Sequence, residues 1–156
     1  MKTELVVVGK TTNKHIQACI DDYIERLGHY MSFGLTIIPE LKNTKAMTAE
    51  QQKEREGELI LQRLSTTDTL VLLDEKGTEF RSIEMAAWLQ KKQLSARRLV
   101  FVIGGPYGFS PEVYDRANEK LSLSRLTFSH QMVRLVFVEQ LYRACTIIKG
   151  EPYHHE

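Results

Sequence analysis

The sequence predicts an α/β protein with a mostly parallel sheet flanked by helices. Short apolar runs alternate with segments of helical periodicity, and this alternation is typical of strand–helix–strand units. Several of the runs end at Gly, Pro or acidic residues, which commonly terminate strands. With 156 residues, of which 42% are hydrophobic and 26% charged, the chain is long enough to bury one core in one domain spanning residues 1–156.

The N-terminal elements follow from periodicity and from helix-ending residues. The first strand is expected at Glu4–Val8, a continuous β-branched run. Apolar residues recur at helical spacing through 13–30, which predicts a helix that Gly28 closes. A second strand is expected at Phe33–Ile38, because Pro39 cannot donate to a strand ladder.

The remaining elements continue the alternation. Thr48 and Gln51 have the spacing of a capping box, so a charged helix is expected from Thr48 to about Leu64. A strand at Thr69–Leu73 is expected to end in a polar turn at 74–77. The later elements are a helix that Ser82 caps and that ends near Lys92, a strand at Arg98–Ile103, a short helix opened by Ser110 and Pro111, a strand within Leu121–Leu126, and a helix at His130–Lys149 closed by Gly150.

Charge and cysteine content exclude several classes of protein. The formal net charge is +1, from 21 Lys and Arg against 20 Asp and Glu, which argues against a polybasic nucleic-acid coat or membrane clamp. Residues 79–156 carry the positive excess, so a local RNA-binding patch is still compatible with the sequence. Cys19 and Cys145 lie in apolar helical patterns, where a cysteine behaves as a small hydrophobe, and neither has metal-ligand spacing. We therefore expect a reduced, cytoplasmic protein without a metal, a signal peptide or a membrane span.

Three segments at expected strand ends are candidates for ligand binding, because open parallel sheets bind ligands at the carboxyl ends of their strands. Glycines at 104, 105 and 108 follow one strand, and a simple tight turn explains them about as well. Asp74 and Glu75 follow another strand and are equally typical of a solvated turn. The segment 121–130 alternates apolar and hydroxyl residues before a helix that Ser129 is suited to cap. Neither a dinucleotide-binding nor a P-loop glycine pattern is present.

The last helix and the tail suggest contacts with other molecules. The segment 130–149 is apolar almost all round, which indicates burial on more than one side and favours an isologous dimer. Glu139 and Arg143 have the spacing of a surface ion pair, and the same arginine is suited to contact a phosphate or a base. The terminal Tyr-His-His-Glu is expected to fray, although its aromatic and imidazole rings are suited to stack on a base.

These pieces coincide with the motifs of one family. They are Leu-Asp at 73–74, Phe-Val-Ile-Gly-Gly-Pro-Tyr-Gly at 101–108, Leu-Ser-Leu-Ser-Arg-Leu-Thr-Phe-Ser-His-Gln-Met-Val-Arg at 121–134, Glu-Gln-Leu-Tyr-Arg-Ala at 139–144 and Pro-Tyr-His at 152–154. In this order and across the whole chain, they closely resemble the ribosomal RNA large subunit methyltransferase H family of the SPOUT superfamily. The family usually has a proline where this chain has Ser129, so we expect a less rigid loop here.

The resemblance implies a fold, an activity and a cofactor. It implies an α/β methyltransferase with a deep C-terminal trefoil knot, the knot and cofactor site lying within about 70–156. It implies a homodimer that uses S-adenosyl-L-methionine to methylate N3 of pseudouridine 1915 in 23S rRNA, within the assembled 70S ribosome. By the family pattern, the cofactor contacts fall on Leu73, Gly104, Leu123, Ser124, Arg125, Leu126, Thr127 and Phe128.

The chemistry of methyl transfer suggests further candidates. The N3 proton must leave, so a base that titrates near neutral pH is useful, and His154 and His130 are the suitable side chains, ahead of Glu139. Arg143 or Arg134 is suited to stabilise the uracil anion. Two alternatives remain open at this point: a SPOUT methyltransferase for another RNA, such as tRNA, and a non-catalytic, ribosome-associated module that binds a nucleotide-like ligand.

Overall fold

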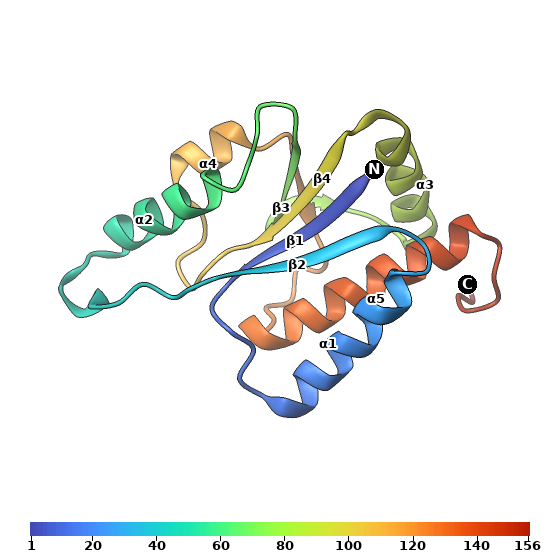
Figure 1. The fold of residues 1–156 in the computed structure, drawn as a ribbon, viewed down its shortest axis with the longest axis horizontal. Coiled ribbons are helices and arrows are strands. Elements are labelled where there is room, and N and C mark those ends of the chain that lie inside the picture. Colours follow the sequence, from blue (N-terminus) through green and yellow to red (C-terminus); the bar gives the residue numbers. More distant parts are fainter.

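A computed structural model describes residues 1–156 and contains one five-stranded sheet in the order β2-β1-β4-β3-β5 (Figure 1). Every neighbouring pair of strands is parallel, as the sequence predicted for most of the sheet. The elements are β1 (Lys2–Val8), α1 (Lys14–Leu27), β2 (Ser32–Ile38), the 3-10 turn η1 (Thr44–Ala46), α2 (Ala49–Leu61), β3 (Thr69–Glu79), α3 (Ser82–Ser95), β4 (Arg98–Ile103), α4 (Pro111–Arg116), β5 (Glu119–Ser122) and α5 (His130–Ile148).

Helices cover both faces of the sheet, so the core has two halves. Helices α1, α3 and α5 lie on one face and α2 and α4 on the other (Figure 1). Because successive strand residues point to opposite faces, Leu5 and Val7 of β1 join the first half of the core, whereas Val6 joins the second. All three side chains are buried, which explains why this strand reads as a continuous apolar run.

Helix α5 is apolar almost all round because it packs against two helices as well as the sheet. It contacts α1 on one side and α3 on the other, and Phe137, Val138 and Leu141 are fully buried within this one chain. Packing inside one protomer therefore accounts for most of its apolar surface. The dimer inferred from this helix stays a prediction, as does the trefoil knot.

Most of the helix boundaries agree with the expected capping residues. Thr48 and Gln51 form the capping box reciprocally, with N···O distances of 3.1 and 3.0 Å, and Ser110 caps α4. Ser129 accepts a hydrogen bond from the Met132 backbone N–H at 3.1 Å, so this serine provides a cap for α5. The expected cap at Ser82 is wrong.

Arg81 occupies the N-cap position of α3 instead. Its backbone N–H donates to the Glu84 carboxylate at 2.7 Å, so the acidic side chain three residues on satisfies the start of the helix. Ser82 is the first residue inside the helix.

The boundaries of β3 and β5 differ from those expected. The strand expected to end at Leu73 extends to Glu79 instead. Residues 74–77 nevertheless leave the ladder as a bulge, because Leu73 and Thr78 both pair with Leu121 of β5. Gly77 permits this, since a Cβ there would lie 2.6 Å from the Lys120 carbonyl carbon and 2.7 Å from the Leu121 nitrogen. Strand β5 ends at Ser122, which leaves 123–128 as a loop.

Two smaller predictions about burial are also corrected. Cys145 is buried, but Cys19 is exposed on α1 and does not belong to the core. The tail is held rather than frayed, because the Tyr30 hydroxyl donates to the Glu151 carboxylate at 2.5 Å and the Tyr153 hydroxyl donates to Glu139 at 3.0 Å. No helix combines the length and apolar character needed to cross a membrane.

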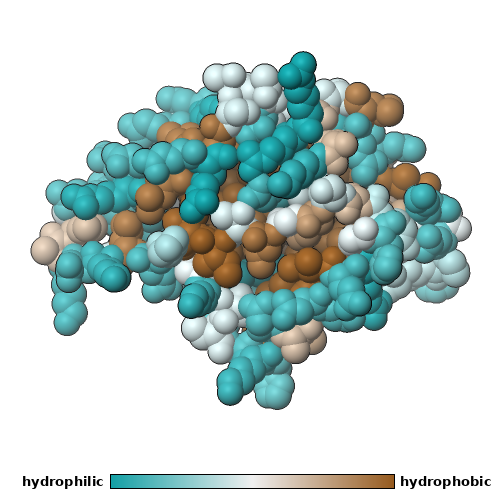
Figure 2. Space-filling view, viewed as in Figure 1, coloured by the Kyte–Doolittle hydropathy of each residue, from teal (hydrophilic) through white to brown (hydrophobic).

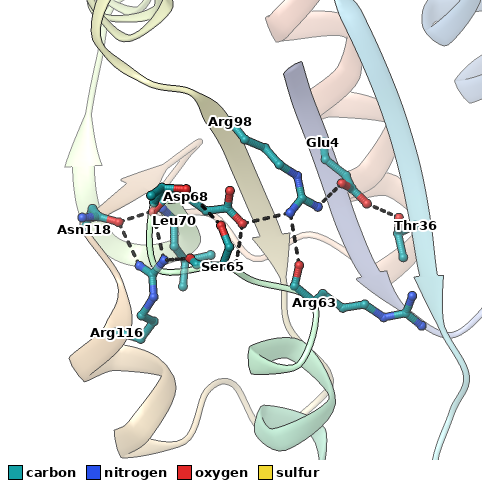
Figure 3. Close-up of polar contacts among 10 residues, drawn as sticks. Glu4, Thr36, Arg63, Ser65, Asp68, Leu70, Arg98, Arg116 and Asn118 are labelled. Carbon is teal, nitrogen blue, oxygen red and sulfur yellow. Dashed lines mark hydrogen bonds and ion pairs between the residues drawn. The ribbon is translucent and has the colours of Figure 1, made fainter. Parts of the chain in front are cut away.

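A polar network ties together the amino-terminal ends of the strands (Figure 3). Arg98 at the start of β4 forms ion pairs with Glu4 of β1 and, at 2.9 Å, with Asp68 before β3. Glu4 also accepts a hydrogen bond from Thr36 of β2. Burial alone raises the pKa of Glu4, but the hydrogen bonds from Thr36 and Arg98 outweigh it and hold the pKa below its ordinary value. The network therefore fixes this edge, and the opposite edge is where the loops open.

Candidate functional site

A cavity of about 440 Å³ opens at the bulge of β3 and at the carboxyl ends of β4 and β5. Its walls are the bulge of β3, the glycine-rich loop after β4, the loop between β5 and α5, and the first turn of α5. The lining residues are Leu73, Asp74, Glu75, Lys76, Ile103, Gly104, Gly105, Pro106, Tyr107, Gly108, Phe109, Tyr114, Leu121, Leu123, Ser124, Leu126, Thr127, Phe128, His130 and Val133. The volume lies within the range of about 300–1,000 Å³ that small-molecule sites occupy.

The glycine-rich loop forms the wall that follows β4. Its residues 105–108 make a tight turn, in which the Gly108 N–H donates to the Gly105 carbonyl at 3.2 Å and Gly108 has a φ of +84°. A Cβ at Gly104 would lie 3.0 Å from the Phe109 ring, so glycine lets the backbone pass close above that buried ring. The result is a floor of bare backbone, which a ligand can approach closely.

Asp74 supplies an oriented carboxylate in the bulge of β3. Its carboxylate accepts hydrogen bonds from the Tyr114 hydroxyl and, at 2.8 Å, from the Lys76 backbone N–H. Burial and this carboxylate together raise the pKa of Tyr114 to about 12. Tyr114 therefore remains a neutral donor, and Asp74 is an oriented acceptor rather than part of a solvated turn.

The loop between β5 and α5 contributes most of the residues that the family pattern marks for the cofactor. Its shape is fixed locally, since the Leu126 N–H donates to the Ser124 hydroxyl at 3.0 Å and the Ser122 hydroxyl donates to the Ser124 carbonyl at 3.2 Å. Seven of the eight marked residues line the cavity: Leu73, Gly104, Leu123, Ser124, Leu126, Thr127 and Phe128. Arg125 does not line it, because its side chain is 87% exposed and pairs with Glu79 at 3.0 Å.

The catalytic candidates are divided between two places. His130 begins α5 and lines the cavity. His154 and Arg143 form a separate cluster, in which the Arg143 guanidinium lies 3.1 Å from His154 Nδ1 and 2.7 Å from the Glu139 carboxylate. Arg143 follows His130 by 13 positions along α5, which is about 20 Å at 1.5 Å per residue. The two groups therefore cannot meet in one protomer.

Arg134 holds the backbone of its own chain. Its guanidinium donates to the carbonyls of Val8 and Gly9 at 2.8 and 2.9 Å and to the Thr11 hydroxyl at 3.0 Å. The residue is only 5% exposed, and burial lowers its pKa. These contacts hold the end of β1 in place. The side chain of Arg134 does not line the cavity.

Sequence reasoning missed three residues near the site. Tyr107 and Tyr114 line the cavity, and Glu56 of α2 lies behind the glycine-rich loop, where a Cβ at Gly105 would meet its carboxylate at 2.4 Å. Burial raises the pKa of Glu56, although a hydrogen bond from Gln52 at 3.2 Å partly opposes this. The tyrosines stand inside or next to motifs that were visible, but nothing in a charged helix marks Glu56 as buried.

Comparison with known proteins gives the class to which this fold and cavity belong. A family model described as a predicted SPOUT methyltransferase matches residues 1–154. Curated proteins named ribosomal RNA large subunit methyltransferase H align over their full length and that of this chain, with 61% identity in Bacteroides fragilis, 60% in Phocaeicola vulgatus and 57% in Flavobacterium johnsoniae. The chain belongs to the ribosomal RNA large subunit methyltransferase H family of SPOUT methyltransferases.

Proposed function

We propose that this protein transfers a methyl group from S-adenosyl-L-methionine to N3 of pseudouridine 1915 in 23S rRNA, within the assembled 70S ribosome in the cytoplasm. The observation that carries the proposal is the convergence of three strand-end loops on one cavity, lined by seven of the eight residues that the family pattern marks for the cofactor. The names of the relatives, which specify large subunit ribosomal RNA, support the class of substrate.

The residues of the cavity fit this cofactor. The cavity has the volume of a small-molecule site, and its lining is half hydrophobic, which suits an adenosyl group. The carboxylate of Asp74 would favour a cationic ligand, and the bare backbone at Gly104 would allow close approach. When bound, the cofactor supplies an electrophilic methyl group on its sulfonium. Leu73, Gly104 and the loop 123–128 would hold it and orient that methyl group toward the cavity mouth.

The target nitrogen carries a proton that must leave for methyl transfer. His130 lines the cavity and is the candidate within the same protomer to accept that proton at an imidazole nitrogen. Arg143 lies about 20 Å along α5 from His130, and His154 of the tail is bound to Arg143 at that distant end. This cluster could therefore reach only the cavity of a second copy of the chain. We propose a homodimer in which the cluster faces the partner's cavity. There Arg143 would stabilise the uracil anion.

Methylation with labelled cofactor tests the proposal directly. We expect the label to enter 70S ribosomes from a strain lacking the gene, and mass spectrometry to place it on N3 of the pseudouridine. Naked 23S rRNA and tRNA should remain unlabelled. If only tRNA were labelled, tRNA would be the substrate in place of rRNA. If calorimetry detected no binding of the cofactor, a non-catalytic module would be favoured.

Mixed dimers test the shared site. We combine one His154→Ala protomer with one His130→Ala protomer. If the cluster acts across the interface, one of the two sites keeps both histidines and the other loses both. The mixed dimer should then retain about half of the wild-type activity. The separate homodimers should both be impaired. If the His154→Ala homodimer were as active as the wild-type homodimer, His154 would have no role in the reaction.

A further inference from the structure

Tyr107 is the most exposed aromatic side chain in the cavity lining. Tyr107 is 54% exposed, whereas Phe109 is only 6% exposed. Phe109 and Tyr114 pack edge to face with their ring centroids 5.7 Å apart, and the Tyr114 hydroxyl is engaged by Asp74. Tyr107 has neither a ring partner nor a hydrogen-bonding partner for its hydroxyl. One large aromatic face is therefore free at the rim of the site.

The turn that carries Tyr107 holds it in place. Gly105 and Gly108 close the turn through a hydrogen bond and a bridge, so Pro106 and Tyr107 occupy its two central positions. Proline at the second position of a turn is pre-set in φ, and glycine at the fourth supplies the positive φ of +84°. A ring presented from such a turn loses little backbone entropy on binding a ligand.

A second exposed apolar side chain lies on the facing loop. Leu126 belongs to the lining and is 77% exposed. Large apolar side chains left in water at the rim of a cavity commonly mark a binding surface. Apolar side chains also reach the surface over β2 (Figure 2). No residue of β2 lines the cavity. Among the large apolar and aromatic side chains of the lining, Leu126 and Tyr107 are the most exposed, ahead of Tyr114 at 39%.

We propose that Tyr107 is a substrate-binding residue whose ring stacks on the nucleobase to be methylated, with Leu126 bounding the other side of the entrance. The inference rests on the proposed function, because it places an RNA base at the mouth of the cofactor cavity. Single-stranded RNA is recognised largely by splayed bases that stack on aromatic rings. Stacking does not depend on charge, so it suits a chain whose formal net charge is +1.

Three substitutions at Tyr107 separate stacking from other roles. The measurement is kcat and KM for transfer of a labelled methyl group to 70S ribosomes. Base–aromatic stacking is worth about 1–3 kcal/mol per base, so Tyr107→Ala should lower kcat/KM by about 5- to 150-fold. Tyr107→Leu, which is apolar but has no ring, should be impaired to the same extent. Tyr107→Phe should recover most of the loss, because it restores the ring.

The controls cover folding and the cofactor. Leu94→Ala removes an 87% exposed apolar side chain on α3, outside the cavity, and should leave kcat/KM unchanged. Calorimetry should give the same Kd for the cofactor in wild type and in Tyr107→Ala. Because Tyr107 is exposed, the urea midpoint of Tyr107→Ala should also match that of wild type.

Several outcomes would overturn the inference while the proposed function stands. They are full activity of Tyr107→Ala, activity of Tyr107→Leu equal to that of Tyr107→Phe, and a loss of cofactor affinity in Tyr107→Ala that matches its loss of rate. The last outcome would place the ring on the adenine of the cofactor. Failure of the wild-type protein to label any ribosome would instead refute the proposed function.

Discussion

Replacing Arg134 by methionine should destabilise the fold rather than disable an intact site. The change removes three hydrogen bonds from a buried guanidinium and leaves the carbonyls of Val8 and Gly9 without their donor. Hydrogen bonds to charged groups contribute about 1.5–3 kcal/mol each, and methionine retains part of the packing, so we expect a loss of about 3–5 kcal/mol in unfolding free energy. That is a large share of the ~5–15 kcal/mol of a typical domain.

Urea unfolding followed by circular dichroism measures this loss. Arg134→Lys should fall between wild type and Arg134→Met, because an ammonium keeps the charge but not the fork of donors. Arg125→Met serves as the control, since its exposed ion pair should change stability by less than ~1 kcal/mol. If Arg134→Met unfolded like wild type while methyl transfer fell a hundredfold, this structural role would be the wrong explanation and Arg134 would act in catalysis.

The other predictions concern close packing, pH and salt. Gly77→Ala should cost about 1–3 kcal/mol of unfolding free energy, because its Cβ would meet the backbone of β5, whereas Gly34→Ala, with no atom within 4 Å, should gain about 0.5–1 kcal/mol. Glu4 has a lowered pKa in the folded protein, so its stabilisation is present above its ordinary value of 4.5 and lost as pH falls below it; Glu4→Gln should flatten that dependence in urea titrations. Glu56 has a raised pKa, so Glu56→Gln should increase the urea midpoint at pH 7, and the gain should vanish toward low pH. Finally, kcat/KM for ribosomes should fall less than about tenfold between 50 and 200 mM salt, against the ~10³- to 10⁵-fold loss in affinity of proteins that make six to ten phosphate contacts.

Local patterns predicted the elements whose causes are local. The bounds of β4 match the expected Arg98–Ile103, and the caps at Thr48, Ser110 and Ser129 are confirmed, because a cap depends on residues within one turn of the helix. The extension of β3 through Gly77 was missed for the opposite reason. Residues 74–77 have the composition of a turn and do leave the ladder, but pairing resumes at Thr78 and Glu79 because β5 supplies a partner strand more than forty residues later.

The position of the cavity could be predicted from the sequence, but the contacts of the nearby charged residues could not. The carboxyl ends of parallel strands meet at one edge, so three separate loops were expected to share one site. Whether Arg134 faces a substrate or its own backbone depends on where Gly9 lies, 125 residues earlier in the chain. The same holds for Glu56, whose burial results from the approach of the glycine-rich loop to α2. Long-range packing decides such roles, and a single sequence does not encode it in any local pattern.

The charge of the chain bears on how RNA would be recognised. A formal net charge of +1 leaves little electrostatic attraction for a bare phosphate backbone, even when a dimer doubles it. Several of the cations in the structure are already committed within the chain: Arg98 pairs with Glu4 and Asp68, Arg143 with Glu139, and Arg134 with backbone carbonyls. The rim of the cavity instead exposes an aromatic ring and an aliphatic side chain. If the proposed function holds, affinity would come from shape and stacking, which an assembled ribosomal surface offers in fixed geometry and a free RNA strand does not.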